Sequence, residues 1–419
     1  MSGETAAEDR GFREYAVDAA LYALSAAFAL FTATSSTLLP HRAWGAIAVW
    51  AYAGALLAVV AQLIAYRRKL LKSGRVALTW ITWVAAALVP LVVQAVQRAG
   101  GRVDRAQEEV LVVERMGERL LHDGTPYLSR DAIAALPLDE RLMGYSPYQP
   151  GMAVFGLPRA IVGDYWWTDA RVWFAVVTAA ALIMAMRLLP ESPWSVRALQ
   201  AVTVLPICAL TLATGGDDIP VLALCLLALA AAATDRYGWA GVAVGAAAAC
   251  KLFALPVVAV LIVLAIVTKR AGRLIPGALA LPVVVLIPPF LVNRDAFLEN
   301  VIRFPLGHGL VKSPAQSPFP GHLIAEHLPA GRFVALGLLV AVAGIITVRI
   351  LMRPPRTAAT ASMICGWGLL AAILLMPTTR FGYLLYPVAF LIWGLALRGA
   401  HRNHTAFSAP TDDTALYRL

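Results

Sequence analysis

Residues 240–268 read AGVAVGAAAACKLFALPVVAVLIVLAIVT, and the way this stretch crosses the membrane decides the fold. It is apolar except for Lys251 and is long enough to span a hydrocarbon core of about 30 Å as one helix. A single crossing would place Lys269 and Arg270 on the opposite side of the membrane from the basic loop at 67–75. Basic loops normally stay in the cytoplasm, so the two groups should be on the same side. We therefore expect two short helices that form a hairpin. Lys251 lies at its tip near the outer face, where polar backbone must border protein or a wet cavity.

The composition places most of the chain in lipid. Of the 419 residues, 60% are hydrophobic and 14% are charged, whereas soluble proteins have about 25% charged residues. Apolar runs of spanning length recur along the whole sequence, which predicts one all-α, polytopic transmembrane helical bundle. The formal charge of +10 is then a topological signal, because nucleic-acid binding would call for a basic soluble module.

Hydropathy predicts about twelve membrane segments. They lie at 15–39, 43–65, 76–96, 171–189, 198–213, 219–233, 240–249, 252–268, 274–292, 333–351, 358–376 and 381–397. The predicted regions are a cytoplasmic tail (1–14), three first helices (15–97), an extracytoplasmic loop with interfacial helices (98–170), the remaining transmembrane core (171–397) and a disordered cytoplasmic tail (398–419).

The basic residues orient these segments. Arg67, Arg68, Lys69, Lys72 and Arg75 form a short, dense loop of the kind that is held in the cytoplasm. Alternation then places both termini inside and the two long polar loops, at 98–169 and 293–332, outside. We expect a multi-pass protein of the plasma membrane.

Four cysteines lie within apolar runs and have neither CxxC nor Cys/His metal spacing. They are Cys208, Cys225, Cys250 and Cys365. We expect them to be small packing residues rather than disulfide or zinc ligands.

The first long loop is predicted to contain a helix that packs on the bundle or lies along the interface. One face carries apolar residues at helical spacing, namely Val110, Val113, Gly117, Leu120 and Leu121. The other face carries Glu114, Arg115, Glu118 and Arg119. Glu108 and Glu109 stand at the N-terminal end, where the helix dipole favours negative charge in any case. The two glutamates are therefore either dipole partners or functional acids.

Aromatic residues follow this helix and alternate with prolines and glycines. A helix stop and turn leads into Tyr127, and Tyr145 and Tyr148 come next, with a further aromatic group at 165–167. Such residues form an interface belt, and they also stack against a sugar or a prenyl chain, so both interpretations stay open.

Four places in the sequence carry a resemblance to one enzyme family. They are the segment from Glu109 through Val112, Val113, Met116 and Leu120 to the turn at 124–127, the Tyr-Ser-Pro-Tyr-Gln-Pro element at 145–150, Gly-Gly-Asp-Asp at 215–218, and the glycine-rich 241–251 with Pro256 after it. Across 76–397 the chain resembles glycosyltransferase superfamily C (GT-C), whose members use polyprenyl-phosphate sugars. It is most similar to glycosyltransferase family 87, which includes polyprenol-phosphate-mannose-dependent α-mannosyltransferases.

This resemblance implies that a hexose is transferred, with inversion, to a lipid-linked or cell-envelope acceptor on the extracytoplasmic face. Mannose is the first candidate for the hexose. Such transfer needs a base that takes the proton of the acceptor hydroxyl while phosphate leaves, and an outer-face carboxylate suits that role. By register with the family pattern, Glu109 is the first candidate and Glu108 the second. The usual family acid is aspartate, and two extra helices precede the family's first core helix.

The leaving phosphate should be held by cations on the outer side. Lys251 and Arg380 are the first candidates, and Arg303 and Lys312 are the others. The alternative for Lys251 is a side chain that reaches to the headgroups, and for Arg380 it is interfacial anchoring.

Further residues are candidates for contact with the sugar, the phosphate or the prenyl chain. They are Tyr127, Tyr145, Tyr148, Asp217, Asp218, His308 and His322. The aspartate pair is alternatively a solvated turn or a divalent-ion site, and a histidine in a loop is usually only solvated. We expect no metal and no cofactor; the expected partners are membrane lipids, the donor and the acceptor.

Two rival hypotheses remain at this point. A transporter or lipid flippase would concentrate charge near the middle of the membrane on discontinuous helices with an internal repeat, and no repeat is evident. A GT-C-like scaffold without activity is the second rival, because glutamate replaces the usual aspartate.

Overall fold

The computed structural model describes residues 3–68 and 74–407, with side chains placed over 11–68 and 74–398. Within these residues nine helical stretches are long and apolar enough to cross a membrane. They are α1 (Gly3–Ser35), α2 (Leu39–Arg67), the stretch Arg75–Ala99, α9 (Ala170–Leu188), the stretch Pro193–Thr214, α15 (Ala271–Val292), α18 (Gly331–Met352), α19 (Ala358–Leu375) and Phe381–Arg398. The shorter apolar helices are α12 (Asp218–Ala233), α13 (Tyr237–Cys250) and Leu252–Val267, which contains α14 (Leu255–Val267).

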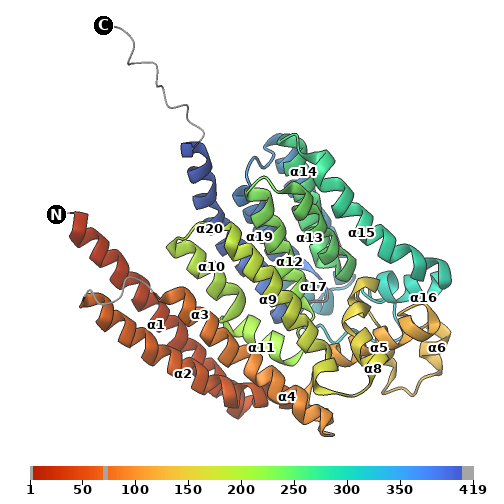
Figure 1. Cartoon of the computed structure of the whole chain (residues 1–419). Helices are drawn as coiled ribbons and strands as arrows, with labels where there is room; N and C mark the ends of the chain where they lie inside the picture. The colour runs from red at the N-terminus through yellow and green to blue at the C-terminus, as the bar shows by residue number, and fades with distance from the viewer. Residues whose placement is uncertain (1–2, 69–73, 408–419) are drawn as a thin grey trace.

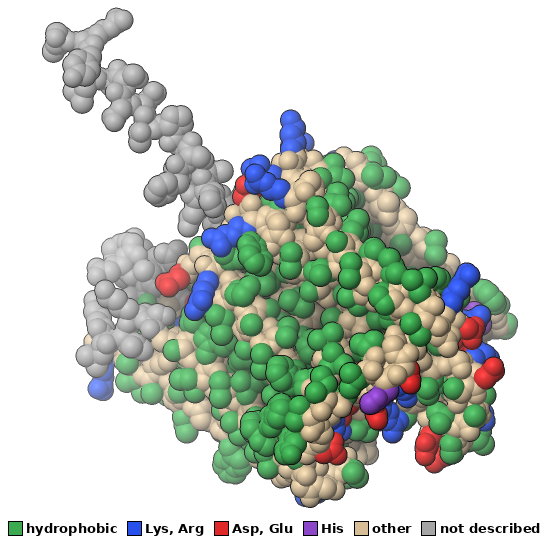
Figure 2. All heavy atoms as spheres, turned by 45° about the vertical axis from the view of Figure 1, so that its right-hand side comes forward, with side chains coloured by type: hydrophobic (Ala, Val, Ile, Leu, Met, Phe, Trp, Pro, Cys, Tyr) green, Lys and Arg blue, Asp and Glu red, His purple; other side chains and the backbone are tan. Residues whose placement is uncertain are grey.

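The predicted all-α, multi-pass fold is confirmed, whereas the number of crossings stays a prediction. Figure 2 shows hydrophobic side chains over the middle of the molecule, with charged side chains gathered toward its upper and lower-right ends. This distribution is the one expected of a protein whose middle faces lipid.

Two of the long stretches are interrupted at prolines. In Arg75–Ala99 a π-helical turn (Val84–Leu88) joins α3 (Arg75–Trp83) to α4 (Val89–Ala99), and it ends two residues before Pro90. In Pro193–Thr214, α10 (Pro193–Thr203) ends just before α11 (Pro206–Thr214), because Pro206 has no amide hydrogen and holds Leu205 in an extended conformation.

The predicted hairpin around Lys251 is confirmed. Lys251 is extended, with φ −153° and ψ 142°, and separates α13 from the 3-10 turn that begins α14. The far ends of the two arms meet, since the Thr268 hydroxyl donates to the Tyr237 hydroxyl over 3.0 Å. Arg270 also pairs there with Asp235 at 2.8 Å. The turn at Lys251 is therefore at the opposite end of the hairpin from these basic residues.

Glycine lets this hairpin pack closely on α15. A Cβ added at Gly241 or Gly245 would collide with the carbonyl oxygens of Leu274 and Gly277, respectively. Small residues at a four-residue spacing allow such backbone approach between membrane helices. The glycine-rich sequence before Lys251 thus fixes the arm that carries it.

The two helices that precede the family-like region belong to the same bundle. Asp18 on α1 is buried and pairs with Arg75 on α3 at 2.5 Å and with Arg197 on α10. Arg75, which was predicted in the short basic loop, begins α3 and is 7% exposed. Residues 69–73 of that loop lie outside the described residues.

The two ends of the chain extend the predicted helices. Helix α1 begins at Gly3, inside the segment predicted as a tail, and α20 (Leu385–Phe407) continues past the predicted end at 397. Residues 408–419 of the predicted C-terminal tail lie outside the described residues. All four cysteines are buried and their thiols are free, as expected of packing residues.

The two long polar loops form a cap of short helices at one end of the bundle. The first loop contains α5 (Glu108–Asp123), α6 (Arg130–Ala135), α7 (Arg141–Gly144) and α8 (Leu157–Val162), and the second contains α16 (Arg294–Leu298) and α17 (Pro320–His327). Figure 1 shows α5, α6, α8 and α16 together at its lower right, away from the turn between α14 and α15 at the top.

Helix α5 packs on the bundle through the predicted apolar face. Val110, Val113 and Gly117 are buried, whereas Leu121 is 47% exposed. Glu114, predicted on the polar face, is buried as well, because Arg98 of α4 bonds both of its carboxylate oxygens at 2.8 and 2.5 Å. Glu114 is thus buried although it lies on the predicted polar face, since a buried partner compensates its charge.

Candidate functional site

The loop cap brings a carboxylate and a guanidinium together at the start of α5. Glu109, in the first turn of that helix, forms an ion pair with Arg380, which stands just before the last membrane stretch. Its neighbour Glu108 points to solvent and has no ion pair among the described residues. Burial alone would lower the pKa of Arg380, but the Glu109 carboxylate outweighs it and raises that pKa above its ordinary value.

Hydrogen bonds to α11 fix the start of α5. The Gln107 amide donates to the Thr214 carbonyl oxygen over 2.9 Å, and the Thr214 hydroxyl donates to Gln107 Oε1 over 2.8 Å. Arg171, which is fully buried, donates to the carbonyl oxygens of Arg105 and Ala213 over 2.8 and 3.1 Å. These bonds hold the segment before Glu109 against the end of α11, which precedes the aspartate pair in the sequence.

A second buried ion cluster lies at the tip of the α13–α14 hairpin. Lys251 Nζ is 2.6 Å from Asp217 Oδ2 and 2.7 Å from Asp218 Oδ1. The Tyr386 hydroxyl donates to the same Asp218 oxygen over 2.7 Å. Lys251, Asp217 and Asp218 are 4–7% exposed. The interpretations of Lys251 as reaching to the headgroups and of the aspartates as a solvated turn are therefore wrong, because each charge is met by a buried partner.

Tyr148 joins the two charge clusters. Its ring centre is 5.2 Å from Lys251 Nζ, and the Tyr383 ring is 5.6 Å away from the same nitrogen. Burial, together with the negative charges of Asp217 and Glu109, raises the pKa of Tyr148 well above its ordinary value. The hydroxyl thus stays protonated at neutral pH. It is therefore a hydrogen-bond donor, close enough to Asp217 and Glu109 for both charges to affect its pKa.

The first loop is fastened directly to the hairpin tip. The Gln149 amide donates to the Cys250 carbonyl oxygen over 3.1 Å, and Tyr127 donates to the Tyr148 carbonyl oxygen over 2.7 Å. Gln149 Oε1 is buried and has no hydrogen-bond partner among the described residues.

Of the predicted site residues, Glu109, Arg380, Lys251, the two aspartates and Tyr148 are brought together. Tyr145 is not. Its hydroxyl donates to Glu299 over 2.8 Å and accepts from the Leu310 amide over 2.7 Å, and its ring stacks on Phe304. These contacts hold the two long loops to each other.

The remaining cations and histidines lie outside these clusters. Arg303 pairs with Asp295 at 2.8 Å and Glu299 at 3.4 Å, while Lys312 and His308 are exposed. His322 Nδ1 is 3.0 Å from the Pro377 carbonyl oxygen, which places it on the segment that leads to Arg380.

Sequence reasoning missed two tyrosines of the site. Tyr383 and Tyr386 follow Arg380 at successive intervals of three residues, which aligns side chains along one face of a helical segment. That spacing was a usable signal, but the contact with Lys251 depends on the packing of the last membrane helix against the hairpin.

The described residues contain no group of three or more His, Cys, Asp or Glu side chains placed to hold a metal ion. Asp217 and Asp218, the pair considered for a divalent ion, are both bonded to Lys251. That no metal and no cofactor take part stays a prediction.

Comparison with known proteins adds a family match. The model of glycosyltransferase family 87 matches residues 146–377, which is more than half of the chain. No curated protein is significantly similar in sequence. A solved structure, ArnT from Cupriavidus metallidurans bound to undecaprenyl phosphate, is similar with a TM-score of 0.43 and 18% identity. The similarity covers 76% of this chain and 60% of that one. This chain thus spans less than two thirds of that structure's length.

Proposed function

Because this chain belongs to glycosyltransferase family 87, we propose that it is a membrane glycosyltransferase that uses a polyprenyl-phosphate sugar. The sugar is a hexose, with mannose as the first candidate, and the acceptor is lipid-linked or part of the cell envelope. The observation that carries this proposal is the ion pair between Glu109 and Arg380 beside the Lys251 cluster. It supplies a proton acceptor and a phosphate-binding cation at the same end of the bundle.

In the proposed reaction the acceptor hydroxyl oxygen attacks the anomeric carbon. The bond from that carbon to the phosphate oxygen breaks, its electron pair stays on the phosphate, and Glu109 takes the hydroxyl proton. Attack from the face opposite the phosphate inverts the anomeric configuration. In this proposal Asp217 and Tyr148 bond sugar hydroxyls, since Asp217 offers acceptor oxygens and Tyr148 a protonated hydroxyl.

Arg380 is the better candidate for the phosphate than Lys251. Lys251 is shared by two carboxylates, so little of its charge is free, whereas Arg380 has one carboxylate partner and five N–H donors. The donor is a phosphodiester with one negative charge, and the leaving phosphate monoester carries more. Arg380 therefore stabilises the product side of the reaction more than the donor, which lowers the barrier. As Arg380 turns to the phosphate, the Glu109 carboxylate is released for the proton.

The donor class is tested with purified protein in lipid nanodiscs and an extract of membrane acceptors. We expect transfer from radiolabelled polyprenyl-phosphate mannose and none from the nucleotide sugar GDP-mannose. Opposite anomeric configurations of donor and product would support inversion. Transfer from the nucleotide sugar alone would contradict the proposed donor.

Arg380→Gln is expected to lower kcat/KM for the donor by about 10²–10³-fold, the usual cost of losing one donor to a developing oxyanion. The matched control is Arg303→Gln, which removes the same charge from the second long loop, where Arg303 pairs with Asp295. Its kinetics should stay close to wild type. Equal losses in both variants would show that general positive charge, not Arg380, is required.

We propose that the site faces the outside of the cell, because it lies opposite the basic turns at the ends of the hairpin arms. Leu138, in the loop cap, is 78% exposed, and Lys269, at the other end, is also exposed. Since the native cysteines are buried, a membrane-impermeant maleimide should label Leu138→Cys in intact cells and Lys269→Cys only after lysis. The reverse pattern would overturn the orientation.

A further inference from the structure

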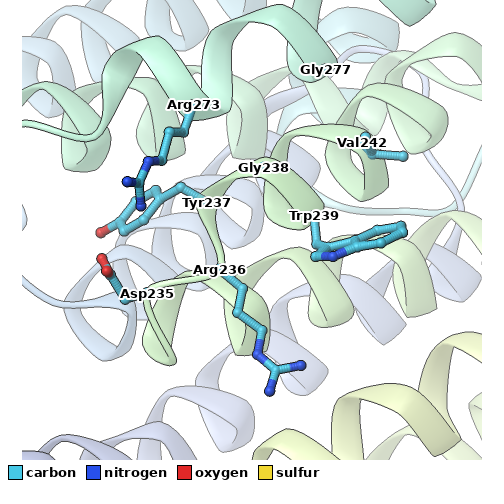
Figure 3. Close-up of a pocket in the computed structure, with 8 residues that line it drawn as sticks. All are labelled: Asp235, Arg236, Tyr237, Gly238, Trp239, Val242, Arg273 and Gly277. Carbon is cyan, nitrogen blue, oxygen red and sulfur yellow. The ribbon is translucent and has the colours of Figure 1, made fainter.

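A groove of about 650 Å³ opens between α13 and α15 at the end of the bundle away from Glu109 and Lys251. Its lining, drawn in Figure 3, is Asp235, Arg236, Tyr237, Gly238, Trp239, Val242, Arg273 and Gly277. Helix α12, 16 residues long, separates it from Asp218 by about 24 Å at 1.5 Å per residue. A smaller hollow of about 290 Å³ shares Asp235 and Tyr237 and adds Arg270 and Arg356. The groove is thus distinct from the candidate catalytic site.

The groove has an excess of positive charge. Its single carboxylate, Asp235, is already bonded through both oxygens to Arg270, at 2.8 and 2.9 Å. Arg236 and Arg273 are exposed and have no ion pair among the residues that the structure describes. Figure 3 shows Arg273 reaching from α15 toward Tyr237 and Asp235, while Arg236 extends from the start of α13. Two guanidinium groups therefore remain for an external anion.

Apolar surface adjoins these arginines. Trp239 is 68% exposed and Val242 43% exposed, both on the outer side of α13. Helix α15 adds exposed apolar side chains along its length, at Leu279, Val283 and Val284, which are 46–65% exposed. A free anion needs no such surface, whereas a phospholipid has a phosphate for the arginines and an acyl chain for the apolar side chains. Basic pockets between membrane helices bind anionic headgroups in this way.

We propose that this groove binds an anionic phospholipid, with its phosphate on Arg236 and Arg273 and an acyl chain along Trp239, Val242 and α15. The lipid would link the start of α13 to the start of α15 and so brace the hairpin that carries Lys251 at its tip. The proposal does not depend on glycosyl transfer, since it concerns binding at the other end of the bundle.

Trp239 provides a direct readout in nanodiscs that contain brominated lipids. The difference in fluorescence between wild type and Trp239→Phe isolates the signal of this residue. At equal mole fraction, brominated phosphatidylglycerol should quench that signal more than brominated phosphatidylcholine. The mole fraction that gives half-maximal quenching should be about tenfold lower for brominated phosphatidylglycerol than for brominated phosphatidylcholine. Equal quenching by the two lipids overturns the proposal.

A pair of double variants then assigns the charge. Arg236→Gln with Arg273→Gln should abolish the preference for phosphatidylglycerol. Arg349→Gln with Arg353→Gln, at the end of α18 and just after it, removes two exposed charges outside both hollows and should keep the preference. If both double variants lose the preference for phosphatidylglycerol, general surface charge explains the binding, and the proposed site at Arg236 and Arg273 is overturned. Full competition by millimolar inorganic phosphate or glycerol phosphate would show a soluble-anion site and overturn the lipid as occupant.

Discussion

Glu109→Gln is expected to lower kcat for sugar transfer by about 10²–10⁴-fold, the usual contribution of a general base. The substitution keeps the size of the side chain and its hydrogen bond to Arg380 but removes the proton acceptor. KM for the donor should change much less than kcat, because Arg380 stays in place and gains freedom to bind phosphate. The measurement is transfer from radiolabelled polyprenyl-phosphate mannose in membranes, with the amount of folded protein equalised.

The neighbouring residue supplies the matched control. Glu108→Gln removes an identical charge one position earlier, from a side chain that points to solvent, and should keep near wild-type activity. This pair also separates catalysis from the helix-dipole interpretation, because both glutamates are in the first turn of α5 and complement its dipole equally well. Full activity in both single variants and in the double variant would end the carboxylate-base proposal. Loss in Glu108→Gln alone would move the base by one residue.

Lys251→Met is expected to cost about 3–5 kcal/mol of stability, because it leaves Asp217 and Asp218 buried without their cation. The methionine side chain fills a similar volume, so the effect reports charge rather than a cavity. The measurement is thermal unfolding in detergent. Lys312→Met, at an exposed lysine of the second long loop, should leave the unfolding temperature unchanged.

Compensating substitutions distinguish this cause from a packing defect. Asp217→Asn and Asp218→Asn, added to Lys251→Met, remove the uncompensated charges and should recover most of the lost stability. Recovery of stability without recovery of activity would assign the aspartates to the sugar site. If the triple variant is as unstable as Lys251→Met, the ion cluster is not what stabilises the hairpin tip.

The resemblance to family 87, taken from short motifs, is confirmed by the family match over residues 146–377. The hairpin at Lys251 was predictable for a different reason. A lysine in the middle of an apolar stretch and a basic group after it admit only one arrangement that keeps the basic groups together. Helix α5 was predictable from the spacing of Val110, Val113 and Gly117. Its end was predictable from Gly124, because glycine readily adopts the left-handed conformation that the structure shows there, with φ +69°.

The partners of the buried charges were not predictable. Glu114 and Arg115 are adjacent in the sequence and equally polar, yet Glu114 is buried against Arg98 and Arg115 is exposed. The same holds for Tyr145, which looked equivalent to Tyr148 but binds Glu299 from the second loop. Such differences arise from contacts between segments that are far apart in the chain.

The sequence by itself determined the membrane environment, the all-helical fold, the hairpin and the set of residues from which the site is drawn. These properties depend on hydropathy and local spacing, which act over a few helical turns. Only the tertiary structure decided that Glu109 meets Arg380, 271 positions later, and that Lys251 is held by Asp217 and Asp218. The physical reason is that a buried charge needs an opposite charge within a few ångströms, and only the packed helices determine which one is there.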